Sequence, residues 1–234
     1  MAHDCVASEE RGLSDRLRNT QRDRRPSRPN MSADSRWIVE GGQGDDILRA
    51  TEPTPDEIVS AAPLLAAFYN ESHNRAMLAH TGELSPDEVV AYYEDLRADG
   101  SHPFLLWRQG VLAGDADFRN IRGGTAEFAI LIGDRGTQGR GIGTRFAVML
   151  HAFAFRILDL ARVYVSIIPG NAASRRLFAR VGYRIDDSPE ARDYVDEDSD
   201  VTMSIDRDVF AARARGRVDA AHADTRFFGR DERI

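Results

Sequence analysis

Two stretches in the first half of the chain place apolar residues three and four positions apart, the spacing of an amphipathic helix. The first begins at Thr54, a favourable N-cap, and contains Pro63, which is expected to kink or split the helix. The second begins at Ser85, where Glu88 three residues later completes a capping box, and ends at Gly100. These patterns predict two consecutive helices.

After the second helix the pattern changes to short runs of β-forming residues separated by turns. Residues 104–107 and 111–118 predict a hairpin. Residues 125–132 (TAEFAILI) are almost all apolar, which is typical of a central strand covered on both faces. A glycine-rich stretch, residues 133–143, follows this strand directly.

The second half of the chain alternates helical and strand patterns. The predicted elements there are helices at 144–160 and 172–181 and strands at 162–168, 183–186 and 201–205. With a short strand at 47–50, the order is β-α-α-β-β-β-α-β-α-β-β. This order predicts an α/β fold in which helices flank one mixed central sheet.

The composition divides the chain into three segments. Residues 1–34 mix charges with Pro and Ser and hold few apolar residues, so we expect a disordered leader. Residues 45–210 carry the predicted elements and form one domain, and residues 211–234 predict a flexible or loosely helical tail. No apolar run approaches the ~20 residues of a membrane span, and no secretory signal is recognisable. We therefore expect no membrane association.

Charge and residue usage exclude several kinds of chemistry. The 31 basic and 38 acidic residues give a formal net charge of −7, which argues against nucleic-acid binding. All basic residues are arginine, which excludes a Walker A phosphate loop, a Schiff-base lysine and a Ser–Lys dyad. Cys5 is the single cysteine, so neither an internal disulfide nor a cysteine-based metal site can form. We expect a cytoplasmic protein without a metal.

The most informative motif is Gln138-Gly-Arg-Gly-Ile-Gly143, which lies between a predicted buried strand and a predicted helix. Glycines let the backbone approach a ligand, and the N–H groups of a helix N-terminus attract anions, so the motif suits a pyrophosphate. A Rossmann fingerprint would need glycine at position 144, which is Thr144. The alternative interpretation is a plain turn that links strand to helix.

The spacing Gln138-x-x-Gly141-x-Gly143 resembles the Q/R-x-x-G-x-G/A signature of the GNAT acyl-CoA N-acyltransferases. The surrounding AEFAILIGDRGTQGRGIGT and the later IPGNAASRRLFARVGYR resemble segments of the branch that includes the ribosomal-protein N-terminal alanine acetyltransferases. The resemblance covers roughly residues 46–210. It implies the GNAT fold, with a mixed central sheet that is splayed at the cofactor site.

The resemblance also implies acetyl-CoA as co-substrate. Its pyrophosphate would lie on the backbone N–H groups of the glycine loop, and its pantetheine arm beside the strand that precedes the loop. The residues expected to bind it are Ala129, Ile130, Leu131, Ile132, Gln138, Gly139, Arg140, Gly141, Ile142, Gly143, Thr144, Asn171 and Ser174. Asn171 either contacts the arm or simply caps the helix that follows it.

An amine acceptor must lose a proton before it attacks the thioester, and a carboxylate can accept that proton. Glu127 is the expected base, because a carboxylate among apolar strand residues needs a purpose or a partner. The alternative is that Glu127 faces solvent, with Asp117 as the second acidic candidate. The tyrosine that many family members use as general acid is replaced by Phe178, so either Ser174 donates the proton or no acid is needed.

The resulting hypothesis is an N-acetyltransferase that transfers an acetyl group from acetyl-CoA to a primary amine, either a protein N-terminus or a small molecule. The alternative is a non-catalytic sensor or scaffold with the same fold. We expect a monomer or homodimer with no nucleic-acid partner.

Overall fold

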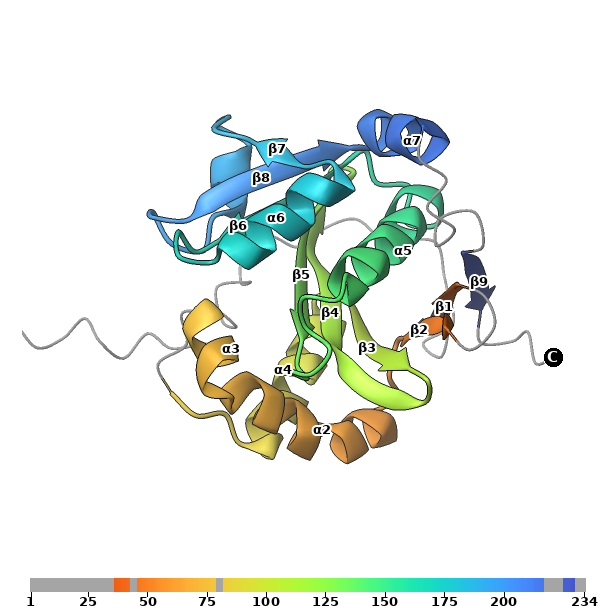
Figure 1. Cartoon of the computed structure of the whole chain (residues 1–234), viewed down its shortest axis with the longest axis vertical. Coiled ribbons are helices and arrows are strands. Elements are labelled where there is room, and N and C mark those ends of the chain that lie inside the picture. The colour runs from red at the N-terminus through yellow and green to blue at the C-terminus, as the bar shows by residue number, and fades with distance from the viewer. Residues whose placement is uncertain (1–35, 43–45, 79–81, 217–224, 230–234) are drawn as a thin grey trace, which may run out of the picture.

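A computed structural model describes residues 36–42, 46–78, 82–216 and 225–229. Over these residues the strands form one sheet in the order β7-β8-β6-β5-β4-β3-β2-β1-β9 (Figure 1). The strands are β1 Trp37–Gly41, β2 Leu48–Thr51, β3 His102–Arg108, β4 Val111–Arg122, β5 Thr125–Ile132, β6 Arg162–Ile167, β7 Arg184–Ile185, β8 Val201–Asp206 and β9 Arg226–Gly229. The helices are α2 Pro55–Asn70, α3 Ser72–Met77, α4 Pro86–Ala98, α5 Ile142–Arg156, α6 Ala172–Val181 and α7 Arg207–Gly216, with a 3₁₀ turn at Ala191–Tyr194.

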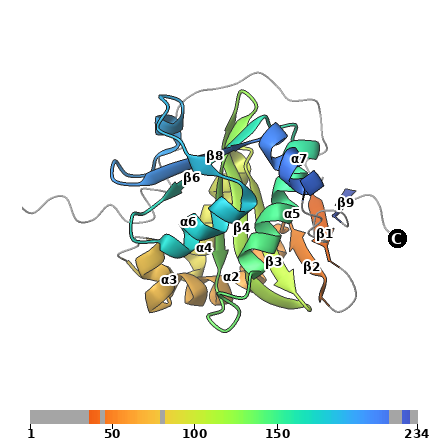
Figure 2. The same ribbon diagram turned by 45° about the horizontal axis from the view of Figure 1, so that its top comes forward.

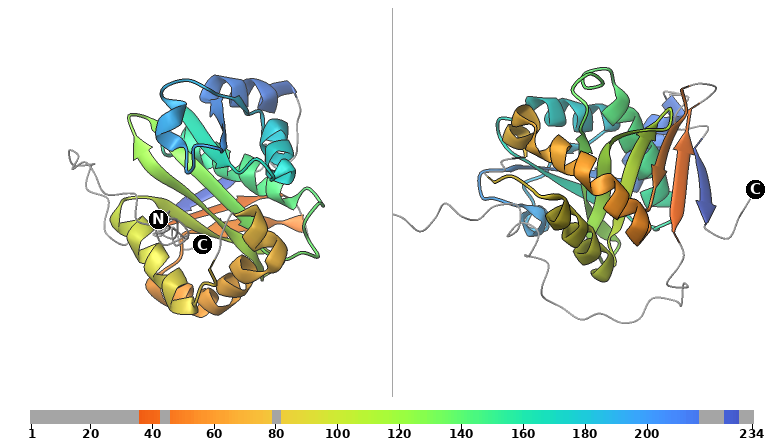
Figure 3. Two further views of the ribbon diagram at one scale, coloured as in Figure 1. Left: turned by 90° about the vertical axis from the view of Figure 1, so that its left-hand side faces the viewer. Right: turned by 90° about the horizontal axis from the view of Figure 1, so that it is seen from below.

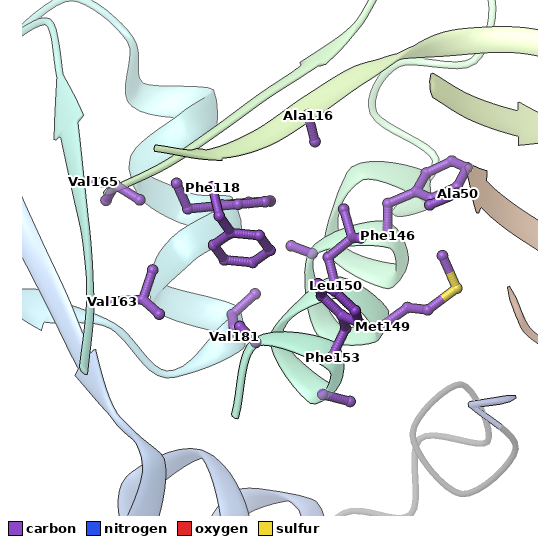
Figure 4. Close-up of a cluster of buried hydrophobic side chains, with 14 of the residues drawn as sticks. Ala50, Ala116, Phe118, Phe146, Met149, Leu150, Phe153, Val163, Val165 and Val181 are labelled. Atoms are coloured by element: carbon purple, nitrogen blue, oxygen red, sulfur yellow. The ribbon is translucent and has the colours of Figure 1, made fainter. Parts of the chain in front are cut away.

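Helices cover both faces of the sheet. Helices α5 and α6 lie side by side over one face (Figure 2), and α2 and α4 pack together on the other (Figure 3). Strand β3 is apolar at successive positions because Phe104 and Leu106 join the core under α5, whereas Leu105 joins the core under α2 and α4. Figure 4 shows the α5 side of this packing. The expected α/β architecture is confirmed.

The first two predicted helices begin where their caps indicate. Thr54 and Ser85 each accept a hydrogen bond from the backbone N–H three residues on and complete a capping box. Helix α2 continues through Pro63, so of the two expected effects, a kink or a split, the split does not occur. Pro63 is on the exposed side of the helix, so the carbonyl that loses its N–H partner can bind water instead. Among the described residues, no helix is long and apolar enough to cross a membrane.

The sheet extends past the expected limits of 45 and 210. Strand β1 lies before residue 45. Strand β9 lies after residue 210, within the segment expected to be a loose tail, and pairs with β1 antiparallel. Both strands are short, so their pairing partners rather than a strong local pattern define them. Helix α7 continues to Gly216. The predicted leader, 1–34, and residues 217–224 and 230–234 lie outside the described residues.

The feature that positions the site is a divergence of two parallel strands. Strands β5 and β6 pair only at Thr125, Ala126 and Glu127 of β5. Beyond that point β6 continues along β8, whereas β5 continues along β4 as far as Ile132 (Figure 1). The backbone of β5 after Glu127 is therefore unpaired on the β6 side. The expected splay of the sheet is confirmed.

Candidate active site

The glycine loop connects β5 to α5 through two residues with positive φ. Gly139 has φ 74°, and Gly141, the N-cap of α5, has φ 80° and provides no side-chain cap. A Cβ added at either position would meet no atom within 4 Å, so the backbone here is open to a ligand. The first N–H groups of α5 have no partner within the helix, and no acidic residue lies in its first turn. The loop is thus suited to an anion.

A network behind the loop holds its shape. The Gln138 amide Nε2 donates to Ile132 O at 2.7 Å and to Asn74 Oδ1 at 2.8 Å. Asn74 is 2% exposed, and its Nδ2 donates to the carbonyls of Phe68 and Gly133. Gln138 therefore connects the glycine loop to α3 and the end of α2, and its amide group helps to fix the conformation of the loop.

A cavity of about 330 Å³ lies in front of the loop. The expected cofactor residues that line it are Ile130, Leu131, Ile132, Gln138, Gly139, Gly141, Gly143, Thr144, Asn171 and Ser174. Ala129 lines a second cavity instead. Arg140 and Ile142 are absent from the lining of both cavities. The side chain of Arg140 is exposed, whereas that of Ile142 is buried in the core, so Ile142 can contribute only its backbone groups.

Two arginines of α6 also line this cavity, and the sequence analysis did not identify them. Arg176 and Arg180 are four residues apart and so lie on one face of the helix. A guanidinium group is positively charged and can donate two parallel hydrogen bonds to a phosphate, so both side chains suit a phosphate group. The four-residue spacing of these arginines on the predicted helix at 172–181 was the signal that could have identified them.

The second cavity, of about 140 Å³, is acidic and joins the first. Both are lined by the end of α3, by the unpaired part of β5 and by the N-terminus of α6. The residues shared by both cavities are Met77, Leu78, Ile130, Leu131, Asn171 and Ser174. The two cavities therefore adjoin at these residues.

Two carboxylates of β4 face the acidic cavity because they are two residues apart on a strand. Asp115 Oδ2 accepts hydrogen bonds from Tyr69 at 2.5 Å and Tyr93 at 3.0 Å, and Asp117 Oδ2 accepts one from Tyr92 at 3.2 Å. The second oxygen of each, Oδ1, is buried and has no hydrogen-bond partner among the described residues. Burial raises the pKa of Asp115 to about 7 and that of Asp117 to about 6.

Glu127, the expected base, lines the same cavity but is fully engaged. Strand β4 runs past its expected end at 118 and places Arg119 opposite Glu127. Glu127 Oε1 accepts from Arg119 Nη2 at 2.5 Å and Oε2 accepts from Asn120 Nδ2 at 2.7 Å. The side chain is 2% exposed, so the alternative of a solvent-facing Glu127 is wrong.

The remaining predicted residues lie at or near the N-terminus of α6 and in the core behind it, and Asn171 and Ser174 line both cavities. Asn171 caps α6 by accepting from Ser174 N at 2.9 Å and donates to Met77 O at 3.1 Å, so its amide also joins α6 to α3. Phe178 lies at the cavity wall without a hydroxyl group. Tyr183, five residues after Phe178, is buried in the core and hydrogen-bonded to His151.

The sequence analysis missed most of the acidic cavity. Asp115, Asp196, Asp200 and Arg119 all line it. The alternation in GDADFR, with two carboxylates two residues apart among apolar neighbours, was a usable signal. Over the part of the chain that the structure describes, no group of three or more His, Cys, Asp or Glu side chains could hold a metal ion.

Comparison with known proteins identifies a family by sequence. The sequence model of the acetyltransferase (GNAT) domain matches residues 48–184. No protein with a curated description matches the chain.

Solved structures with a similar fold include Mycobacterium smegmatis RimJ in complex with CoA-disulfide, at 17% identity and TM-score 0.61, covering 79% of this chain and 94% of that one. Aminoglycoside acetyltransferase AAC(6')-Ib with coenzyme A has 17% identity and TM-score 0.60, covering 72% and 99%. Vibrio cholerae spermidine N-acetyltransferase with CoA and spermine has 18% identity and TM-score 0.58, covering 70% and 98%. At these identities the likeness concerns the fold.

Proposed function

Because the chain belongs to the acetyltransferase (GNAT) family, we propose that it transfers the acetyl group of acetyl-CoA to a primary amine by direct attack. The observation that carries the proposal is the meeting of two cavities at the unpaired part of β5. One is lined by a glycine loop and arginines, and the other by carboxylates. An anionic thioester donor and a cationic acceptor would each find complementary charge, with their reacting ends at the junction.

The residues present fit coenzyme A, since the backbone at Gly139 and Gly141 is open to a ligand. The N–H groups of residues 139–143 would hold the pyrophosphate, and Arg176 and Arg180 would pair with phosphate oxygens. The free backbone of β5 at 129–132 would hydrogen-bond the pantetheine arm in the manner of an added strand. Bound there, acetyl-CoA supplies the activated acetyl thioester.

We assign proton acceptance to Asp117, with Glu127 as the positioning residue for Arg119. Both Glu127 oxygens already accept hydrogen bonds from Arg119 and Asn120, so a new donor would have to share or displace these contacts. Asp117 Oδ1 has no hydrogen-bond partner, and a pKa of about 6 leaves the carboxylate ionised at pH 7 while making it more basic than an ordinary aspartate. Asp117 would take the proton from the ammonium group before the nitrogen attacks.

Phe178 lines the acidic cavity at the position where many family members have a tyrosine, so no tyrosine hydroxyl is there to protonate the leaving thiolate. Ser174 lines both cavities, and its hydroxyl would donate a hydrogen bond to the sulfur. The missing tyrosine also favours the second candidate function, a module that binds acetyl-CoA without turning it over.

The test is release of free thiol from acetyl-CoA by the purified protein with a panel of primary amines, with products identified by mass spectrometry. Amine-dependent thiol release together with an N-acetylated product supports the enzyme. Tight binding of acetyl-CoA by calorimetry without amine-dependent release supports the binding module and refutes the enzyme.

A further inference from the structure

We infer that the acceptor is a small molecule with at least two ammonium groups, one bound at Asp115 and Asp117 and the other at Asp196 and Asp200. This inference rests on the proposed function and names the substrate class of the same site. Among the residues that the structure describes, the lining of the acidic cavity carries five carboxylates and one cationic side chain, Arg119.

Arg119 cannot neutralise this set of carboxylates. Its closest ion pair is with Glu127 at 2.5 Å, whereas its nitrogens lie 3.9 Å from Asp117 Oδ1 and 3.8 Å from Asp196 Oδ2. One guanidinium balances one carboxylate, so the cavity retains an excess of negative charge. Excess charge in a partly desolvated cavity is costly until it is neutralised, either by protons or by a ligand of opposite sign.

The inner end of the cavity has unused hydrogen-bonding capacity. Asp115 is 5% exposed and Asp117 is 6% exposed, and within the described part of the chain the Oδ1 atom of each lacks a hydrogen-bond partner. An ammonium group has three donors and no acceptor, so it can satisfy two such oxygens at once. The tyrosines bound to the opposite oxygens hold both carboxylates in place.

The outer end is formed by the segment between the 3₁₀ turn and β8. Ser166, near the end of β6, donates its hydroxyl to Asp200 Oδ2 at 2.9 Å and accepts the Asp196 N–H at 3.1 Å. One serine therefore fixes the segment that carries both outer carboxylates. The Asp196 side chain is 27% exposed, so this end opens towards solvent, where a second ammonium group can reach it.

The two ends lie within reach of one small molecule. Asp117 at the inner end and Asp196 at the outer end both lie within 4 Å of nitrogens on the same Arg119 guanidinium. A protein N-terminus would place one ammonium group at the inner end and then a neutral backbone along the outer carboxylates. A diamine would place a charge at each end, which matches the distribution of carboxylates.

The experiment compares n-butylamine, 1,4-diaminobutane and an N-terminal alanyl peptide as acceptors at pH 8 and fixed ionic strength. The first two differ mainly in the second amine. We expect kcat/KM for the diamine to exceed that for the monoamine and the peptide by about tenfold or more, the factor of one charge-assisted hydrogen bond. The advantage should shrink as salt is added.

The matched variants are Asp200→Asn and Asp198→Asn. The asparagine oxygen at position 200 can still accept from Ser166, so the segment keeps its anchor. Asp198 is exposed in the same segment and lies outside the cavity lining. We expect Asp200→Asn to reduce the preference for the diamine over the monoamine about tenfold, while Asp198→Asn keeps the preference.

Equal kcat/KM for diamine and monoamine, or an equal loss for both in Asp200→Asn, would overturn the inference and leave the acetyltransferase intact. A preference for the alanyl peptide would overturn it in favour of a protein N-terminus. If no amine releases thiol, the proposed function fails, and calorimetry with 1,4-diaminobutane then decides the inference. Binding weakened by Asp200→Asn supports it, and absence of binding refutes it.

Discussion

Asp115→Asn should make the protein more stable at high pH, because the wild-type carboxylate is costly to ionise where it lies. The variant keeps an oxygen that can accept from Tyr69 and Tyr93, and its side chain is neutral at every pH. Burial raises the pKa of Asp115 from 3.8 to about 7. The folded state therefore holds a proton between pH 4 and 7 that the unfolded state releases, and wild-type stability falls as pH rises through this window.

The size of the effect follows from the shift. About three pKa units, at 1.36 kcal/mol each, amount to roughly 4 kcal/mol lost in full above pH 7. The variant should therefore match the wild type near pH 4 and exceed it by up to about 4 kcal/mol at pH 8 without an amine present. Urea unfolding followed by tryptophan fluorescence at pH 4.5, 6 and 8 measures the difference.

Asp198→Asn is the control, because it removes the same charge at an exposed position and should leave the pH dependence unchanged. A difference between Asp115→Asn and wild type that stays constant from pH 4.5 to 8 would refute the reasoning. It would mean that Asp115 is not a destabilising buried carboxylate and that the cavity has no need of a cation at its inner end.

Three further outcomes are expected. Gly141→Asp should abolish coenzyme A binding in calorimetry, because it strains a residue at φ 80° and adds negative charge at the cradle; undiminished affinity would remove the pyrophosphate assignment. Asp117→Asn should reduce kcat about 10²–10⁴-fold and remove the decline in rate below pH 6, whereas Glu127→Gln should retain that decline; the reverse pattern in pH–rate profiles would make Glu127 the base. Asn74→Ala leaves buried carbonyls without their donor, so it should destabilise the fold by about 2–4 kcal/mol, as measured by urea unfolding. It should also raise KM for acetyl-CoA more than it changes kcat in steady-state kinetics. An unchanged KM would show that the loop keeps its shape without this network.

Local sequence was sufficient where the physical cause is local. The capping boxes at Thr54 and Ser85 and the glycines that permit positive φ at the loop act within a few residues, and the structure has each of them. The run TAEFAILI predicted a central strand because both of its faces are covered by helices. Motif order likewise indicated the family, which the domain match confirms.

Only the tertiary structure determined which side chains of the site contact one another. The sequence identified Glu127 as a candidate functional carboxylate within a strand. Its partners, however, depend on how far β4 extends and on the register that sets Arg119 opposite it. Asp115 gains its partners from helices 22 and 46 residues away, and Asn74 meets Gln138 across 64. Contacts over such separations follow from packing and strand register, which no local pattern encodes. The same reason explains β9, which exists as a strand because β1 offers it an edge.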